Sequence, residues 1–585
     1  MPLIGTAGHV DHGKSTLIQR LTGMDPDRWE EEKRRGLTID LGFAWSVLPS
    51  GTEVSFVDVP GHERYLRNML AGVEAIDVAL LVVAADEGWM PQSEEHLAVL
   101  DLLDVTRGVV ALTKTDLVDD ELTEMAALEV AEHLAGTGLS GAPILPVSAT
   151  KGDGIDRLVE ALDALLAGFV PIDRGRPRLW IDRSFPVPGA GTVVTGTLLG
   201  GRLRTDDEVT VYPGGRRARI RGMQTHERAV QEAEPGRRVA LNLAGVDHAE
   251  LSRGDMVGLT GQWDLTSRFS VELRPARYVD ELDPRGAYQI HIGSSTHQMR
   301  FLDIEGGGAV IVTEGLLPVV AGDRFIVRDT GRRLVTAGGR VFDPSPGATK
   351  QALRLGSGFD AAAAPDDLAT ALLEMRKRDT ASRLNAHSGG GKPQDGVEAG
   401  DWFLSPSEYQ RLSTALREMV ARQHEAHPLR PGAPVATLAE RLDIPQEIVD
   451  RIVEESADLV RAGPDIASAH HRVALPADAI PGWDRAKEEL GRGLAVPDVN
   501  QLEIEPETLH LLIRTGQLVR IGPQLAYLPE QVSQIRGLIA RMPAGFTVGD
   551  FRDAAGLSRK YAVPILEWAD REGLTVREGD FRRPR

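Results

Sequence analysis

Short apolar runs alternate with amphipathic segments through the first 170 residues of the chain. The apolar runs have the length of buried strands and lie at 3–7, 54–57, 78–85, 108–113 and 143–147. Segments of helical periodicity separate them near 63–73, 93–104, 119–135 and 154–168. This alternation predicts a mostly parallel sheet with helices on both faces, which binds ligands at the carboxyl ends of its strands.

The pattern changes twice further along the chain. Short β-rich runs broken by glycine predict two small β-barrels, and helix pairs followed by short hairpins then predict tandem winged-helix α+β domains. In the last unit, Thr547 is a candidate helix cap. The predicted domains are an α/β nucleotide domain at 1–172, barrels at 175–262 and 263–350, and a tail at 355–585. The tail divides into about four units, at 366–405, 406–476, 478–530 and 532–585.

Composition narrows the class of protein. The chain of 585 residues contains no cysteine, which excludes disulfides and thiolate chemistry and suits a reducing cytoplasm. Its net charge of −20 argues against non-specific coating of nucleic acid, although a local basic face remains compatible with it. The longest apolar runs fall far short of the ~20 residues that a membrane helix needs. We therefore expect a cytoplasmic monomer that does not associate with membranes.

A glycine-bounded loop at 8–15, Gly-His-Val-Asp-His-Gly-Lys-Ser, stands between a predicted strand and a predicted helix. That context is typical of a phosphate-binding loop, in which backbone N–H groups and the helix N-terminus surround the phosphates. Lys14 would contact the terminal phosphates and the Ser15 hydroxyl would bind Mg²⁺. The residues predicted to contact the nucleotide here are Asp11, His12, Gly13, Lys14, Ser15 and Thr16.

Two further motifs contain groups suited to a γ-phosphate and its metal. Asp58 ends a predicted strand, where its carboxylate can hold the metal through water, and the amide of Gly61 can reach the γ-phosphate. Thr38 offers a hydroxyl that can complete the coordination of Mg²⁺. The predicted metal residues are therefore Ser15, Thr38 and Asp58.

Two motifs after later strands predict the choice of base. The Asp116 carboxylate can accept two hydrogen bonds from guanine, which adenine cannot donate, and the stem of Lys114 can lie along the base. The segment Ser148, Ala149 and Thr150 can supply a backbone N–H to the guanine carbonyl. All these motifs occur in order and at strand ends, so the sequence predicts a GTP-binding switch domain.

Together these motifs resemble the signature set of the translational GTPases. The resemblance implies that His62, which alone could be an ordinary surface histidine, orients the water that attacks GTP. It also implies that Val10 and Leu37 form an apolar gate beside that histidine. Most relatives have Asn where this chain has Thr113, so the amide that braces the phosphate loop is missing and Thr113 offers only a hydroxyl there.

Within that superfamily, the segment 179–185 and the Thr-Lys-Thr-Asp variant most resemble the selenocysteine-specific elongation factors, with elongation factor Tu more distant. The resemblance implies that the first barrel holds the aminoacyl end of selenocysteyl-tRNA and that Asp182, Arg183 and Arg238 line its pocket. An arginine-lined pocket would favour an anionic selenolate over a serine hydroxyl. Taken singly, each arginine could equally be a solvated charge on the barrel.

The tail resembles the C-terminal region of that family, which binds a hairpin in selenoprotein mRNA. Basic side chains gather at the predicted last helix and wing, where phosphates would lie. The residues predicted to contact the mRNA stem-loop are Arg559, Lys560, Tyr561, Arg577, Arg582 and Arg583. A solvated basic end on a structural module is the plainer alternative. The implied function is GTP-dependent delivery of selenocysteyl-tRNA to the ribosome at UGA codons, with hydrolysis on docking.

Two other functions are compatible with the sequence. One is a different translational GTPase, such as an initiation or general elongation factor, with an appended nucleic-acid-binding tail. The other is a transcriptional regulator in which a GTPase domain switches DNA-binding winged helices. The barrels of the tRNA-binding type and His62 favour the translational functions.

Overall fold

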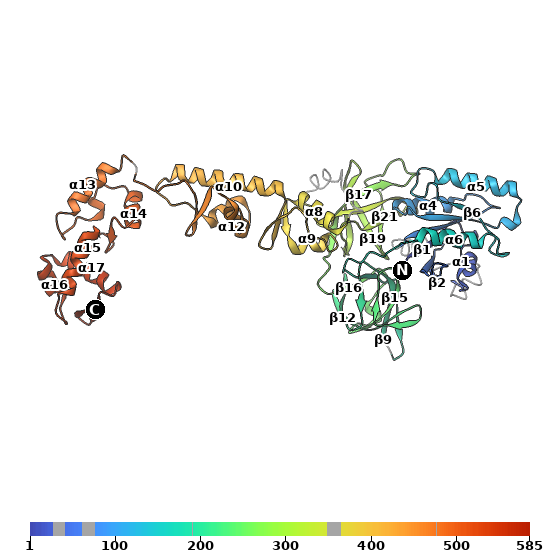
Figure 1. The fold of residues 1–585 in the computed structure, drawn as a ribbon, viewed down its shortest axis with the longest axis horizontal. Helices are drawn as coiled ribbons and strands as arrows, with labels where there is room; N and C mark the ends of the chain where they lie inside the picture. Colours follow the sequence, from blue (N-terminus) through green and yellow to red (C-terminus); the bar gives the residue numbers. More distant parts are fainter. Residues whose placement is uncertain (27–40, 61–75, 190, 348–363, 476) are drawn as a thin grey trace. The chain divides into compact units, whose positions relative to one another are not determined.

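The computed structural model describes residues 1–26, 41–60, 76–189, 191–347, 364–475 and 477–585. The chain forms two compact units, Met1–Ser407 and Glu408–Arg585. Figure 1 shows the helices and strands of each unit. Among the described residues, no helix combines the length and the apolar character needed to cross a bilayer.

The first unit begins with the α/β domain that the alternating pattern predicts. Its six strands lie in the order β2-β3-β1-β4-β5-β6, all parallel except for β2, which runs antiparallel to β3. The strands are β1 (Leu3–Ala7), β2 (Gly42–Val47), β3 (Glu53–Asp58), β4 (Val78–Ala84), β5 (Gly108–Thr113) and β6 (Ile144–Pro146). Every residue of β4 is buried because helices cover both faces, which explains its unbroken apolar run.

The helices of this domain divide between the two faces of the sheet. On one face α1 (Lys14–Thr22) and α6 (Ile155–Leu166) pack over Ile4 and Leu80. On the other face α4 (Pro91–Leu102) and α5 (Asp120–Leu134) pack over Leu81 and Val110. The same apolar cluster continues into Ile326 and Val335 of the second barrel.

The first barrel is antiparallel. Pairing of β11 with β12 closes the path β11-β16-β7-β9-β15-β12 into a ring, and β8 and β13 pair outside it. Its strands are β7 (Arg178–Trp180), β8 (Arg183–Val187), β9 (Gly191–Leu199), β11 (Glu208–Tyr212), β12 (Arg216–Thr225), β13 (Arg228–Val230), β15 (Arg238–Ala244) and β16 (Met256–Leu259). A small ribbon of β10 (Leu203–Arg204) and β14 (Glu232–Ala233) lies beside it. Burial alternates along β9, as expected for a strand with one face in a core.

The second barrel closes in the order β17-β20-β19-β18-β21-β22. Its strands are β17 (Thr266–Pro275), β18 (Tyr288–Ile292), β19 (Ser295–Glu305), β20 (Gly308–Leu317), β21 (Arg324–Asp329) and β22 (Leu334–Asp343). The nucleotide domain contacts both barrels. Trp45 of β2 stacks on His226 of the first barrel with ring centroids 4.9 Å apart, and Arg340 of β22 forms an ion pair with Asp104 after α4.

The first small unit of the tail packs on the second barrel. It consists of α8 (Pro365–Arg376), β23 (Arg378–Thr380), α9 (Ala381–His387), β24 (Val397–Ala399) and β25 (Trp402–Leu404). Leu368 and Leu372 share an apolar cluster with Phe342 of the barrel. Arg376 donates to the buried carboxylates of Asp343 and Asp379, which ties the helix to β22.

The second unit repeats a pattern of helices followed by a hairpin. Its helices are α10 (Pro406–Ala426), α11 (Val435–Leu442), α12 (Gln446–Glu455), α13 (Ile480–Leu490), α14 (Pro506–Arg514), α15 (Pro529–Ala540), α16 (Val548–Ala555) and α17 (Arg559–Arg571). The strands are β26 (Ala433–Pro434), β27 (Leu459–Ala462), β28 (Asp465–Ser468), β29 (Val519–Arg520), β30 (Ala526–Tyr527), β31 (Thr575–Glu578) and β32 (Phe581–Pro584). The predicted cap of α16 is confirmed, because the Thr547 side chain accepts a hydrogen bond from the Asp550 amide.

Candidate functional site

The phosphate loop joins β1 to α1, as the sequence predicts. Gly8 has a φ of +134°, and a Cβ there would lie 2.1 Å from the carbonyl oxygen of Val82, so only glycine fits. Asp11 and Gly13 also have positive φ, and Gly13 precedes the first turn of α1. Ser15 and Thr16 follow within that turn, which places the loop amides and the positive helix end together.

Helix α4 braces this loop from the side, which sequence reasoning missed. The Gly8 amide donates to Nδ1 of His96 at 2.9 Å, and the Val10 amide donates to Oε1 of Gln92 at 3.1 Å. His96 is 2% exposed, and burial lowers its pKa to about 3, so the ring is neutral and can accept. The spacing of Gln92 and His96, one helical turn apart, was the available signal.

Thr113 closes the floor of the loop. Its hydroxyl lies 2.7 Å from the carbonyl oxygen of His12 and 3.3 Å from that of Val83, and donates toward both. The His12 ring is buried against β4, where its Nδ1 accepts from the Ala84 amide at 3.2 Å. The hydroxyl thus contacts the loop at the position where most translational GTPases carry an amide.

Lys14 is buried at the centre of the loop. Its Nζ donates to the carbonyl oxygens of Gly8 at 3.0 Å and His9 at 2.6 Å. Burial lowers its pKa to about 8, opposed by the nearby carboxylates of Asp58 and Asp11. A phosphate bound here would therefore contact a desolvated cation, whose charge the two carboxylates compensate only in part.

Two of the three predicted metal residues meet directly. The Ser15 hydroxyl donates to Oδ2 of Asp58 at 2.6 Å, and Thr6 donates to Oδ1 at 2.8 Å. A hydroxyl and a carboxylate oxygen are the hard ligands that Mg²⁺ prefers, so these residues fit that ion. The third residue, Thr38, lies outside the described residues, as do Leu37, Gly61 and His62.

The predicted guanine-binding residues converge after β5 and β6. Asp116 lies in a short 3₁₀ turn, and the Thr150 hydroxyl donates to its Oδ2 at 3.4 Å. A hydrogen bond from Ser148 lowers the pKa of Asp116, which keeps the carboxylate ready to accept. Ala149 lies between these two hydroxyl residues. Lys114 has a φ of +57°, and its Nζ lies 2.7 Å from a carboxylate oxygen of Glu87.

Two of the three predicted aminoacyl pocket residues, Asp182 and Arg238, meet on the first barrel. Arg238 forms a two-pronged ion pair with Asp182, whose Oδ1 also accepts from Thr195 at 2.6 Å. The Arg238 guanidinium lies 3.4 Å from the ring centroid of Phe43, and both residues line a cavity of about 180 Å³. Arg183 donates to the carbonyl oxygen of Leu41 at 3.0 Å. Asp182 therefore pairs with Arg238, whereas Arg183 contacts the backbone of the nucleotide domain.

Most of the basic residues predicted at the end of the tail are exposed. Arg559 and Lys560 lie in the first turn of α17, with Tyr561 half-buried behind them, and Arg577 and Arg583 lie exposed on the hairpin. Arg582 differs: it is 4% exposed, and its guanidinium lies 2.9 Å from Asp570 of α17. In this structure the Arg582 side chain holds the wing to the helix and is not presented to a phosphate.

Three family models match the chain. They are the elongation factor Tu GTP-binding domain over residues 1–167, elongation factor Tu domain 2 over 191–258, and the elongation factor SelB winged helix over 538–583. The first domain is therefore that of a translational GTPase. The predicted α/β domain, barrel and C-terminal winged helix are confirmed by these matches.

Relatives match the chain over its whole length. It is 34% identical to the selenocysteine-specific elongation factor of Desulfomicrobium baculatum over 100% of both chains. Identity to that of Escherichia coli (strain K12) is 33%, over 99% of this chain and 98% of the other.

Solved structures of selenocysteine-specific elongation factors also resemble this chain. The crystal structure of a bacterial selenocysteine-specific elongation factor superposes with a TM-score of 0.71 at 29% identity over 100% of both chains. SelB of Methanococcus maripaludis, in complex with the GTP analogue GppNHp, gives 0.53 at 26% identity over 59% of this chain and 79% of that one. The chain belongs to the family of selenocysteine-specific elongation factors.

Proposed function

We propose that the chain binds GTP with Mg²⁺, carries selenocysteyl-tRNA to the ribosome at UGA codons, and is held there by an mRNA stem-loop. The observation that carries the proposal is the Asp182–Arg238 pair, set beside Arg183 in the barrel that follows the GTP-binding domain. Full-length similarity to selenocysteine-specific factors supports it over a general elongation factor, because the tail is matched as well.

In the nucleotide site, Ser15 and Asp58, completed by Thr38, would hold Mg²⁺, which neutralises charge on the β- and γ-phosphates when it is bound. Lys14 and the loop amides would bind the same phosphates, and the Gly61 amide would sense the γ-phosphate. His62 is proposed to position the attacking water, with Val10 and Leu37 as its apolar gate. Asp116 would select guanine over adenine.

In the aminoacyl pocket, the excess of guanidinium charge favours an anion. A selenol is ionised at neutral pH, whereas the hydroxyl of serine is not, so Arg183 and Arg238 would discriminate by charge. Arg183 contacts Leu41 and Arg238 contacts Phe43, two residues that closely follow the segment of Thr38. Occupancy of the pocket and the state of the nucleotide would thereby be linked.

In the tail, the exposed cations of α17 and the last hairpin would bind the phosphates of an RNA stem-loop. Phe581 on the same hairpin is 54% exposed, and an exposed aromatic ring can stack on an unpaired base. Binding of a stem-loop beside the codon would raise the effective concentration of the bound tRNA there, which would help that tRNA to compete with termination.

The test compares one tRNA carrying selenocysteine or serine. With GTP present, the unaltered protein should bind the selenocysteyl form at least roughly tenfold more tightly, as expected for a desolvated charge partner. Arg238→Gln should remove most of that preference, whereas Arg238→Lys should retain part of it. Dissociation constants are measured by protection of the aminoacyl ester from hydrolysis.

Arg237→Gln is the matched control, because Arg237 precedes Arg238 but pairs with Glu53 instead. It should leave the preference unchanged. Equal binding of the seryl and selenocysteyl forms by the unaltered protein would refute the proposed pocket.

A further inference from the structure

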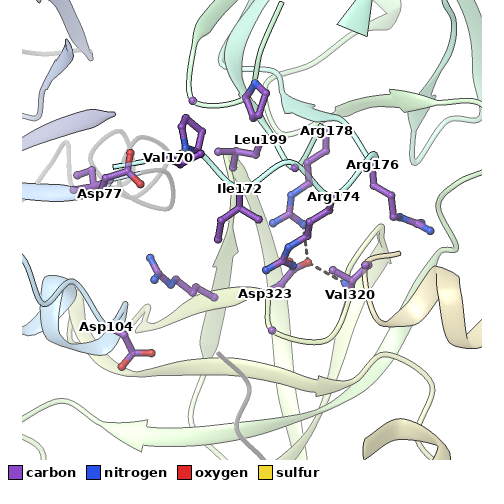
Figure 2. A pocket seen from close by; sticks show the side chains of 18 of the residues that line it. Asp77, Asp104, Val170, Ile172, Arg174, Arg176, Arg178, Leu199, Val320 and Asp323 are labelled. Atoms are coloured by element: carbon purple, nitrogen blue, oxygen red, sulfur yellow. Dashed lines mark hydrogen bonds and ion pairs between the residues drawn. The ribbon is translucent and has the colours of Figure 1, made fainter. Parts of the chain in front are cut away.

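A cavity of about 740 Å³ lies within the first unit, where the nucleotide domain, both barrels and the connecting segment 168–178 meet (Figure 2). From the nucleotide domain it receives Asp77 and Arg107, which precede β4 and β5. These are the amino ends of the parallel strands, whereas the phosphate loop lies at their carboxyl ends. The cavity is therefore separate from the nucleotide site.

Guanidinium groups outnumber carboxylates around this cavity. Among the residues that the structure describes, six arginines and three aspartates line it: Arg107, Arg174, Arg176, Arg178, Arg324 and Arg340, with Asp77, Asp104 and Asp323. All three aspartates are already engaged. Asp323 pairs with Arg178 at 2.8 Å, Asp104 pairs with Arg340 at 2.8 Å, and Asp77 accepts from the Leu3 amide at 2.8 Å.

Several of the guanidinium groups keep unused donors. Within the described part of the chain, Arg107 and Arg174 have no side-chain hydrogen bond or ion pair, and Arg107 is exposed. Arg176 is only 6% exposed. Its Nη1 donates to Asn385 and its guanidinium lies 5.1 Å from the centroid of the Trp263 ring, while its buried Nε and Nη2 have no hydrogen-bond partner among the described residues. Arg176 is thus held within the protein, and the donors open to a ligand in the cavity are those of Arg107 and Arg174.

The connecting segment holds these arginines in place. The amides of Arg174 and Arg176 both donate to the carbonyl oxygen of Gly200, at 2.9 and 3.0 Å. Gly389 and Gly390 lie against the same two arginines, and a Cβ on Gly390 would approach Arg176 to 3.0 Å. Figure 2 shows Arg174 and Arg178 beside Asp323, with Asp77 and Asp104 across the cavity.

Burial acts against the charge of this cluster. It lowers the pKa of both Arg174 and Arg176, and the neighbouring Arg178 lowers both further. Repulsion between like charges in a partly desolvated space is relieved when an anion enters. Planar guanidinium groups suit phosphoryl oxygens, which they bind in pairs.

We propose that this cavity binds an oligophosphate group, which spans the donors of Arg107 on one domain and of Arg174 on the connecting segment. A single phosphate would satisfy only part of this set, whereas two or three linked phosphoryl groups match several arginines at once. The volume also accepts a nucleoside attached to the phosphates. The inference does not depend on the function proposed above.

Because the ligand would contact both the nucleotide domain and the segment that connects it to the barrels, it would stabilise the arrangement in which they meet. An oligophosphate bound here would thus act on the relation between the nucleotide domain and the barrels without entering the phosphate loop.

The test titrates inorganic tripolyphosphate into the full chain saturated with GDP, with calorimetric detection and a fluorescent GDP analogue reporting that the loop stays occupied. We expect saturable 1:1 binding, and roughly tenfold or more weaker binding of inorganic monophosphate. Arg174→Gln and Arg107→Gln should each weaken tripolyphosphate binding by roughly tenfold. ATP, which Asp116 should exclude from the loop, distinguishes the source: tighter binding than tripolyphosphate indicates a nucleotide, and equal or weaker binding indicates a free oligophosphate.

Arg300→Gln is the matched control, because Arg300 is exposed on β19 and does not line the cavity. It should leave the affinity unchanged, and unaltered GDP binding establishes that each variant is folded. The proposal is overturned if the GDP-saturated protein shows no saturable binding, if monophosphate binds as tightly as tripolyphosphate, or if both cavity variants bind as the unaltered protein does.

Discussion

At the scale of single residues, side chains from outside the phosphate loop determine its shape. The loop motif itself can be found in the sequence, because glycine, lysine and serine recur at a characteristic spacing. Its supports cannot, since Gln92, His96 and Thr113 are 82 to 101 positions away from the loop residues that they contact and meet the loop only when the sheet forms. Thr113 departs from the family pattern, and the structure shows that its hydroxyl contacts the carbonyl oxygens of His12 and Val83.

Replacing Thr113 by valine tests this contact. Valine has nearly the same shape as threonine but lacks the hydroxyl, which is the only donor to the His12 carbonyl within the described residues. The loop therefore loses a hydrogen bond that fixes its position. Leaving a buried acceptor unpaired costs about 1–3 kcal/mol, so GDP and GTP should bind roughly 5- to 150-fold more weakly. Equilibrium titration with a fluorescent nucleotide measures the change. Thr113→Ser retains the hydroxyl and should bind nearly as the unaltered protein does; equal loss in both variants would contradict the assignment.

Lys14 predicts a pH dependence of nucleotide binding. Its pKa in the free protein is lowered to about 8, and bound phosphate favours the charged form. Below pH 8 the cation is already present, so affinity should be flat. Between pH 8 and 9 the free protein loses the proton, and affinity should fall by up to about tenfold per unit.

Calorimetry in buffers of different ionisation enthalpy provides the independent check. At pH 8.5 nucleotide binding should take up protons, whereas at pH 7 Lys14 contributes no uptake. Constant affinity from pH 7 to 9 without proton uptake would show that Lys14 keeps an ordinary pKa.

At the scale of elements, the last hairpin shows where pattern reasoning fails. On β32 the apolar Phe581 is exposed and the charged Arg582 is buried, the reverse of the usual assignment of faces. The cause is Asp570 on α17, which supplies a carboxylate inside. Composition indicates a basic wing, but the register that decides which arginine faces inward depends on the helix packed beneath it.

The pair Arg582 and Arg583 allows a matched comparison. Arg582→Ala leaves Asp570 without its partner and should destabilise the last unit by about 2–3 kcal/mol, less than for a fully buried pair because Asp570 is partly exposed. Arg583→Ala should leave stability unchanged. It should instead weaken binding to an RNA stem-loop and reduce the slope of the logarithm of the binding constant against the logarithm of salt concentration by about one.

Thermal unfolding and RNA titration over a range of salt concentrations distinguish the two effects. If Arg583→Ala is the destabilising change, or if Arg582→Ala lowers RNA affinity with unchanged unfolding, the assignment of faces is wrong.

At the scale of the molecule, the order of domains follows from the sequence but their contacts do not. The alternation of apolar runs with amphipathic segments predicts the α/β domain, the short strands broken by glycine predict the barrels, and the helix pairs predict the winged-helix units. The contact of the first tail unit with the second barrel rests on Arg376 and Asp343, 33 positions apart, and on apolar residues that any core would use. The cavity lined by residues 76–389 likewise exists only in the assembled unit.

Truncation tests how the tail divides. A fragment of residues 1–405 retains the first tail unit and should bind GDP as the full chain does. A fragment of residues 1–347 exposes Phe342 and leaves the buried Asp343 carboxylate without Arg376, which costs about 3–5 kcal/mol. Its barrels should unfold roughly 10 °C lower.

Differential scanning calorimetry measures this shift. The fragment of residues 406–585 should fold independently and bind RNA. Equal transition temperatures for the two N-terminal fragments would show that the first tail unit does not support the barrel.

Because Trp45 stacks on His226, tryptophan fluorescence can report on the contact between the nucleotide domain and the first barrel. Trp45 is half-buried in this contact, and its indole would pass into water if the two domains parted. Its emission would then move to longer wavelength, while Trp45→Phe would subtract that component from the spectrum. The chain thus contains an intrinsic fluorescent reporter, which can follow domain separation during GTP turnover without an added label.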